Sequence, residues 1–166
     1  EQVAAVHPDW TLRILGAGPQ EENLREQIRE AGLEGKVELP GRTADIGAEL
    51  EKASIHVMSS RHEGFSLTIL EAMAKGVAIV SFNSPHGPRE MITHGKDGLL
   101  VKPRTVDNLA AAIIQVIEDG ELRRRLAAGG LETARRYDIA TVGAQWEALL
   151  DDLLARRLRA TAPQAP

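Results

Sequence analysis

Short apolar runs alternate with longer segments of helical period along the whole chain. The apolar runs have the length and composition of strands and lie at residues 11–15, 36–39, 54–58, 77–82 and 99–101. The run 77–82 is almost continuously apolar, which is typical of a strand covered on both faces of a parallel sheet.

The segments between these runs repeat apolar residues at helical spacing, at 20–31, 45–52, 66–75, 89–93, 106–118, 121–137 and 139–158. Asp45 is expected to cap the second of these helices, and Gly76 follows the third as a C-terminal stop. Strands that alternate with helices predict an α/β domain, with a Rossmann-like parallel sheet and helices on both faces.

Ligands of such sheets bind beyond the carboxyl ends of the strands. The candidate site therefore lies in the loops at 16–20, 40–44, 59–66 and 83–91. We expect residues 1–160 to form one domain and residues 161–166 to be a disordered tail. Residues 1–6 read like the end of a helix with no initiator Met, so we expect a chain truncated at its N-terminus.

Composition excludes several classes of protein. The chain has no Cys, which rules out disulfides, thiolate zinc sites and a cysteine nucleophile, and it fits a cytoplasmic location. The net charge of −4 offers no basic face for nucleic acid. No apolar run reaches the ~20 residues of a membrane span. The histidines at 56, 62, 86 and 94 have no metal-binding spacing, so no metal site is expected.

The segment 59–76 carries the clearest chemistry. A loop with Gly64 leads into a helix that Ser66 can cap, and the unpaired N–H groups and dipole of a helix start form a site for phosphate. The helix is apolar nearly all round, so we expect it to be buried. Glu71 lies in its middle and Glu63 on the preceding loop, where both carboxylates could accept hydrogen bonds from sugar hydroxyls.

Each of these features has an ordinary explanation when taken alone. A helical Glu among apolar residues more often reaches solvent at a boundary, and a Gly-bearing loop before a helix is usually a simple turn. The features become informative only in combination.

The sequence resembles family 4 of the GT-B glycosyltransferases in several blocks. Glu63-x7-Glu71, with GFS after the first Glu and LEAMA around the second, looks like the E-x7-E signature of that family. LRILGAGP at 12–19, VELPG at 37–41 and GPREMI followed by GKDGLLV at 87–101 resemble further blocks in the same order. The resemblance covers most of residues 8–150 and implies the C-terminal, nucleotide-sugar-binding half of the enzyme.

The resemblance also implies roles for single residues. Glu63, the candidate catalytic residue, would bind hydroxyls of the donor sugar, and Glu71 would bind the ribose. Gly64, Phe65 and Ser66 would shape the sugar pocket with their backbone, and the amides of Leu67 and Thr68 would hold the diphosphate. Gly16 would lie near the phosphates, and Gly41 and Arg42 would lie against the base.

Such enzymes transfer a sugar from a nucleotide diphosphate donor with retention at the anomeric carbon, without a metal ion or other cofactor. The 87–90 block favours a UDP-sugar over a GDP-sugar. The acceptor would bind to an N-terminal domain, and peripheral membrane association would involve only that domain. The sequence lacks both this domain and the family's earlier Gly-Arg…Lys strand, whose loss would leave a gap between the strands at 11–15 and 54–58. The sheet could close up, borrow a strand from a neighbour or stay incomplete, and we expect little activity from this chain alone.

Three alternatives remain open at this stage. Gly16-x-Gly18 after a strand, with Glu38 near the end of the next, is compatible with an NAD-binding oxidoreductase, although Glu21 at the third glycine position would repel a pyrophosphate. The chain could instead be an interaction module without chemistry. It could also be a phosphorylase or a sugar-phosphate synthase on the same fold.

Overall fold

The computed structural model describes the backbone of residues 1–161 and the side chains of residues 1–157. Most of the predicted tail, residues 162–166, lies outside the described residues. The predicted order of elements is confirmed, with small differences at their ends. The elements are α1 (Gln2–Val6), β1 (Leu12–Leu15), α2 (Glu21–Glu30), β2 (Val37–Gly41), α3 (Ile46–Glu51), β3 (Ile55–Met58), α4 (Leu67–Ala74), β4 (Ala78–Phe82), α5 (Pro88–Met91), β5 (Leu99–Val101), α6 (Val106–Glu118), α7 (Gly120–Arg135) and α8 (Ile139–Thr161).

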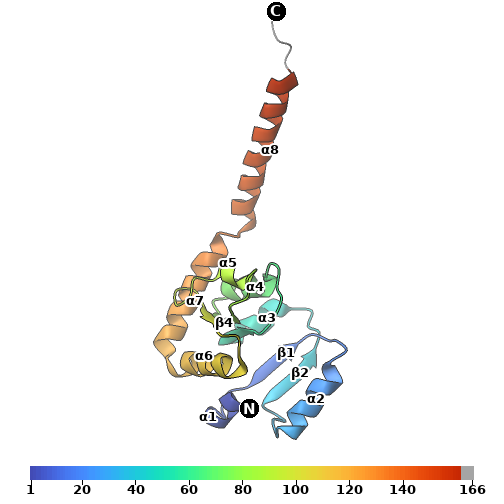
Figure 1. Ribbon diagram of the computed structural model, residues 1–166, viewed down its shortest axis with the longest axis vertical. Helices are drawn as coiled ribbons and strands as arrows, with labels where there is room; N and C mark the ends of the chain where they lie inside the picture. Colours follow the sequence, from blue (N-terminus) through green and yellow to red (C-terminus); the bar gives the residue numbers. More distant parts are fainter. Residues whose placement is uncertain (162–166) are drawn as a thin grey trace, which may run out of the picture.

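The strands form two parallel sheets instead of one. β1 pairs with β2, while β3, β4 and β5 form a separate sheet with β4 in the centre. β1 and β2 lie beside α2 in the lower part of Figure 1, below the three-stranded sheet. Within the described chain β1 and β3 do not pair with each other, so the expected gap between them is confirmed.

An apolar cleft of about 440 Å³ lies beside β1. Ile14 of β1, Leu24 and Ile28 of α2, and Leu109 and Ile113 of α6 contribute to its walls. The β1 side chains on this face are correspondingly open, with Leu12 46% and Ile14 38% exposed. The cleft thus lies between the β1–α2 layer and α6, and residues of α1 line it as well.

β4 is the most deeply buried element. Ala78, Ile79, Val80 and Ser81 are all fully buried, because apolar side chains cover the strand on both faces. Ile79 packs with α4 and α5 in one cluster, and Ala78 and Val80 pack with α6 and α7 in the other. The prediction of a parallel sheet with helices on both faces is confirmed.

α7 packs closely on α4 and on the loop before β5. A side chain on Gly130 would press on Met73 of α4, 3.2 Å from its Cγ, and one on Gly129 would collide with the Lys96 carbonyl. Beside this contact the buried Asp97 carboxylate accepts hydrogen bonds of 2.6 Å from the Thr93 N–H and from the Thr133 hydroxyl. These contacts hold α7 as a support for α4.

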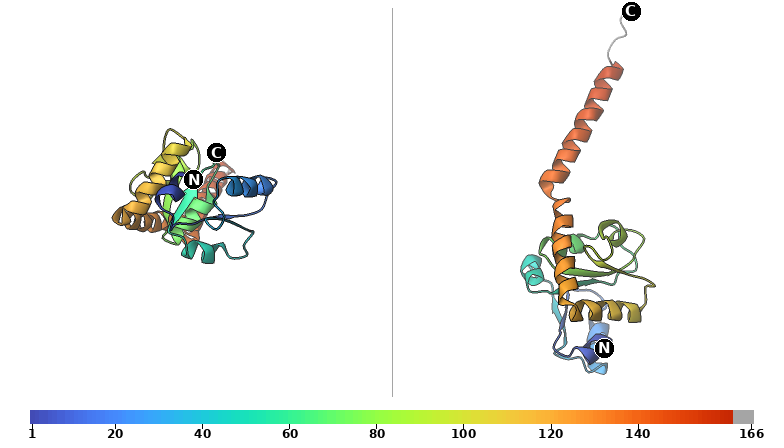
Figure 2. Two further views of the ribbon diagram at one scale, coloured as in Figure 1. Left: turned by 90° about the horizontal axis from the view of Figure 1, so that it is seen from below. Right: turned by 90° about the vertical axis from the view of Figure 1, so that its left-hand side faces the viewer.

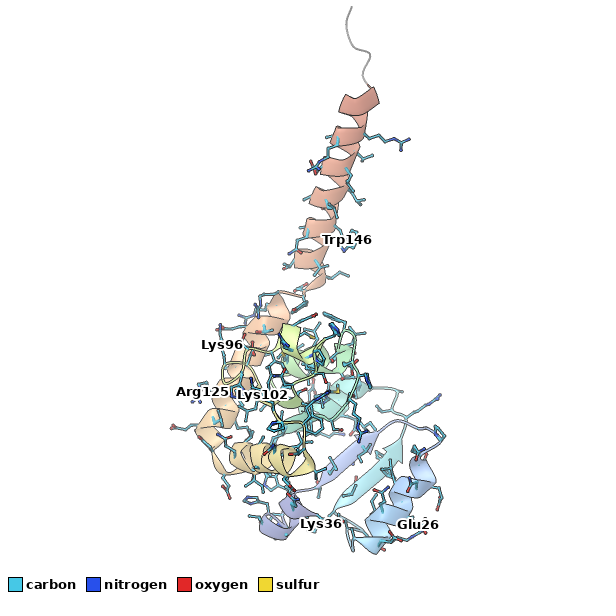
Figure 3. All side chains as sticks on the ribbon, in the orientation of Figure 1. Glu26, Lys36, Lys96, Lys102, Arg125 and Trp146 are labelled. Carbon is cyan, nitrogen blue, oxygen red and sulfur yellow. The ribbon has the colours of Figure 1, made fainter. Side chains whose placement is uncertain are left out.

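α8 continues from the end of α7 and projects away from the domain (Figures 1 and 2). Its apolar side chains are open to solvent, including Trp146, which is 60% exposed and labelled in Figure 3. Leu149, Leu150, Leu153 and Leu154 lie on the same side of the helix at spacings of three and four residues and are about half exposed. Within residues 1–161, no helix has the length and apolarity that crossing a membrane requires.

His56 on β3 is half-buried, and its buried Nε2 atom has no hydrogen-bond partner among the described residues. Burial lowers the pKa of this imidazole below 6.5, because the charged form loses its hydration. Below that pH the unfolded chain binds a proton that the folded chain rejects, so His56 costs stability as the pH falls.

We therefore predict that His56→Leu gains melting temperature relative to the wild type as the pH falls from about 8 to about 5. The difference in free energy of unfolding between the variant and the wild type should change by at most about 1.4 kcal/mol per pH unit. Thermal unfolding across this range measures it, with His62→Leu, which removes an exposed imidazole, as the control. A difference that stays constant with pH would contradict the prediction.

The close contact of α7 predicts opposite effects at two helical glycines. Gly129→Ala should lower the free energy of unfolding by ~1–3 kcal/mol, because the new methyl group overlaps the Lys96 carbonyl. The methyl group of Gly143→Ala, on α8, would have no atom within 4 Å. This variant should raise the free energy of unfolding by up to ~1 kcal/mol, because alanine has the higher helix propensity. Urea unfolding of both variants tests this. Equal effects would show that α7 does not approach the loop this closely.

Candidate functional site

The candidate site is built around the loop between β3 and α4. Because the strands of the central sheet are parallel, this loop, the loop after β4 and the loop after β5 leave the same edge. Met58 at the end of β3 pairs with Ser81, and Phe82 at the end of β4 pairs with Val101. The ends of the strands are therefore nearly level, and the three loops lie side by side.

The start of α4 keeps unfilled hydrogen-bonding capacity. Ser66 is the N-cap residue, but its side chain makes no capping hydrogen bond, and its buried Oγ has no partner among the described residues. The predicted cap is therefore wrong. The Leu67 N–H donates to the Phe65 carbonyl at 3.0 Å, whereas the Thr68 N–H has no backbone acceptor in the described chain. This N–H and the positive end of the helix dipole favour an anion.

α4 is buried on one face only, which corrects the prediction that it is buried all round. Ile69, Ala72 and Met73 are fully buried against the sheet. Leu67 is 61% exposed, and Thr68 and Glu71 are exposed on the same face, since residues three and four apart on a helix are neighbours.

The apolar neighbours of Glu71 led us to expect a buried carboxylate, but Glu71 is exposed. Only one face of α4 packs against the sheet. The apolar residues on its other face are therefore exposed beside Glu71. Glu71 lies one turn after Thr68 on the same exposed face of α4. A ligand held at the N–H groups could reach it.

Side chains from two other loops hold the segment that carries Glu63. The Ser84 hydroxyl, from the loop after β4, donates to the Ser60 carbonyl at 3.1 Å. The Arg104 guanidinium, from the loop after β5, donates to the Arg61 carbonyl at 2.9 Å. Glu63 itself is half-buried and forms no ion pair among the described residues.

Sequence reasoning did not find Ser84, Arg104 or Tyr137. The Phe65 ring packs edge-on against Tyr137 at the end of α7, with centroids 5.7 Å apart and 62° between the planes. Each of these partners is far away in sequence and belongs to no local pattern. Only the register of the strands and the position of α7 bring them to the loop.

Gly16 and Gly41 form a second group of predicted residues. The Gly16 N–H donates to the Gly41 carbonyl at 2.7 Å, and both residues have positive φ, 123° and 79°. Both lie at the carboxyl ends of β1 and β2, and the Arg42 side chain next to them is exposed. No hydrogen bond or ion pair between described residues joins this group to the one from Glu63 to Glu71.

A pocket of about 420 Å³ opens beside Glu71, between α4 and the end of α7. Arg135 and Asp138 supply the other charged groups of its lining, and the rest includes Leu70 and Tyr137. Of the predicted site residues only Glu71 borders it, so the start of α4 is open surface and not part of this pocket.

An ion pair ties α3 to the end of α4. The Lys75 ammonium lies 2.5 Å from the Glu51 carboxylate, which raises the pKa of Lys75 through this hydrogen bond and its charge. Asp45 caps α3 as predicted, accepting the Ala48 N–H at 2.9 Å. Across residues 1–161 no cluster of three or more His, Asp or Glu could hold a metal ion.

Known proteins share this sequence and fold. The model of the family described as "Glycosyl transferases group 1" matches residues 1–133. An exopolysaccharide phosphotransferase of Streptomyces coelicolor is 41% identical over 152 residues, which is 91% of this chain but 16% of that protein. The chain thus spans only a small part of that relative.

Two solved structures show the same architecture. HepE of Anabaena, crystallised with UDP, matches with a TM-score of 0.84 and 28% identity, covering 91% of this chain and 43% of that chain. TarM of S. aureus, in a complex that includes UDP, matches with a TM-score of 0.82 and 25% identity over 89% of this chain and 30% of that chain. The fold is thus that of the C-terminal domain of a GT-B glycosyltransferase. With the family model matched over residues 1–133, the chain belongs to the glycosyl transferases of group 1.

Proposed function

We propose that this chain is the donor-binding domain of a retaining glycosyltransferase that uses a UDP-sugar. The diphosphate lies at the start of α4, Glu71 accepts hydrogen bonds from the ribose, and Glu63 does so from the donor sugar. Gly16, Gly41 and Arg42 lie toward the phosphates and the base. The reaction needs no metal ion.

The observation that carries the proposal is the exposed face at the start of α4. A free N–H at Thr68, the helix dipole and the Glu71 carboxylate share that face. The helix start suits an anion, whereas a carboxylate suits hydroxyl groups as hydrogen-bond donors. A molecule that carries a diphosphate next to a sugar matches both groups in that order.

The choice of UDP is supported by the solved relatives. HepE has also been crystallised with UDP-glucose, in a structure that is 29% identical to this chain with a TM-score of 0.82. The family assignment also favours glycosyl transfer over the NAD-binding alternative, because the Gly16–Gly18 turn belongs to the matched region.

The chemistry assigned to this domain is electrostatic. When the bond between the anomeric carbon and the diphosphate oxygen breaks, negative charge grows on the leaving phosphate. Preorganised N–H groups at a helix start stabilise that charge without rearranging during the reaction. The acceptor binds elsewhere in the complete enzyme, so this domain alone holds the donor without transferring the sugar. The cytoplasmic location and the retention of configuration remain predictions.

We predict that Glu71→Gln weakens UDP binding by about tenfold, because a charged hydrogen-bond acceptor for the ribose is lost. Isothermal titration of UDP measures the change, with EDTA present because the proposal requires no metal ion. Glu26→Gln is the matched control, since Glu26 is an exposed helical carboxylate on α2, labelled in Figure 3. Equal affinity of both variants would remove Glu71 from the site.

Glu63→Gln should affect the binding of the donor sugar and not the binding of the nucleotide. The affinity for UDP-glucose is expected to fall about tenfold, while the affinity for UDP itself stays unchanged. Competition titrations of the two ligands measure this difference. If the variant loses affinity for both ligands equally, Glu63 does not recognise the sugar.

A further inference from the structure

We propose that Gly87 is a positioning residue of the donor site, which fixes the direction of the Gly64–Phe65 peptide and the position of the Glu63 side chain. This inference rests on the proposed function, because it concerns the same loop. Gly87 lies in the loop after β4 and is itself buried.

The three atoms nearest to a β-carbon built on Gly87 all belong to the loop from Glu63 to Ser66. A β-carbon built on Gly87 would overlap the Gly64 carbonyl oxygen and lie 3.1 Å from both the Glu63 Cγ and the Ser66 Oγ. The bare α-carbon therefore packs directly on three residues of this loop. No other residue type leaves this space empty, and the φ of 69° also favours glycine.

This packing determines which way one peptide group points. In a planar trans peptide the C=O and the N–H point in opposite directions. Because the Gly64 carbonyl faces Gly87, the Phe65 N–H points away from it. The Phe65 N–H, like the Thr68 N–H, has no backbone acceptor within the described chain. Rotating the peptide would replace this donor with a carbonyl oxygen, which repels an anion.

The segment from Ser84 to Pro88, which carries Gly87, is held in place at both ends. On one side, Ser84 is buried and bonded to the Ser60 carbonyl at 3.1 Å. On the other, Pro88 is fully buried and begins α5. With both flanks anchored, a side chain at position 87 must displace the loop from Glu63 to Ser66 and not the segment that carries it.

Gly87→Ala tests this role against Gly95→Ala. Both glycines have positive φ, 69° and 78°, so alanine is strained at either position, but the β-carbon at 95 meets nothing within 4 Å. We expect Gly87→Ala to bind UDP-glucose about tenfold more weakly than Gly95→Ala, as when a hydrogen bond to a charged group is lost. The ratio of the UDP-glucose affinity to the UDP affinity should fall with it.

The outcomes separate the two proposals. If the wild-type chain binds neither UDP nor UDP-glucose, the proposed function fails. If the wild type binds both and Glu63→Gln weakens UDP-glucose, but Gly87→Ala matches Gly95→Ala, only the role of Gly87 is overturned. A second readout is the Phe65 amide resonance in ¹⁵N–¹H spectra, which should shift on adding UDP-glucose to the wild type and not to Gly87→Ala.

Ser84→Ala keeps the test decisive if Gly87→Ala does not fold. It removes the hydroxyl that anchors the same segment to the Ser60 carbonyl. We expect a folded variant whose affinity for UDP-glucose is severalfold lower than that of the wild type. Unchanged affinity in a folded Ser84→Ala variant would overturn the proposal.

Discussion

The double-sided burial of β4 is the constraint on which the rest of the domain depends. A strand with four consecutive fully buried residues needs apolar cover on both faces, and α4 and α6 supply it. The position of α4 is therefore set by core packing and not by the site. The parallel pairing with β3 and β5 then brings three loops to one edge, where Ser84 and Arg104 reach the carbonyls of the loop before α4.

The site combines two opposite electrostatic features on one surface. The helix start favours negative charge through the Thr68 N–H and the dipole, whereas Glu63 and Glu71 bring negative charge close to it. These features do not conflict when the ligand is long enough to place an anion at the helix start and hydroxyl groups further along. The exposure of Glu71 keeps its carboxylate hydrated in the free domain.

The backbone of the β3–α4 loop matters as much as its side chains. Its carbonyls at Ser60, Arg61 and Gly64 are each met by a residue of another loop, either through a hydrogen bond or through direct packing. Directing the carbonyls toward the neighbouring loops leaves N–H groups on the opposite side of the chain. Glycine at position 87 and the hydroxyl of Ser84 are small groups, but they control which polar atoms the loop presents.

Sequence periodicity predicted the helices and strands well, and the resemblance to known enzymes predicted the gap between β1 and β3. The periodicity failed at α4. Ser66 precedes the helix as a cap should, yet its hydroxyl is buried beneath Gly87 and makes no capping bond. The apolar composition of the helix suggested full burial, but Leu67 is open because only one face meets the sheet.

The sequence by itself determined the order of the elements, the cap at Asp45 and the burial of β4, and it singled out the segment of the candidate site. These depend on local chemistry, since periodicity, capping and a run of apolar residues act over a few neighbouring positions. Tertiary structure alone decided the partners of the site loop. Ser84 lies 24 residues from Ser60, and Arg104 lies 43 residues from Arg61, so only strand register and packing bring them together.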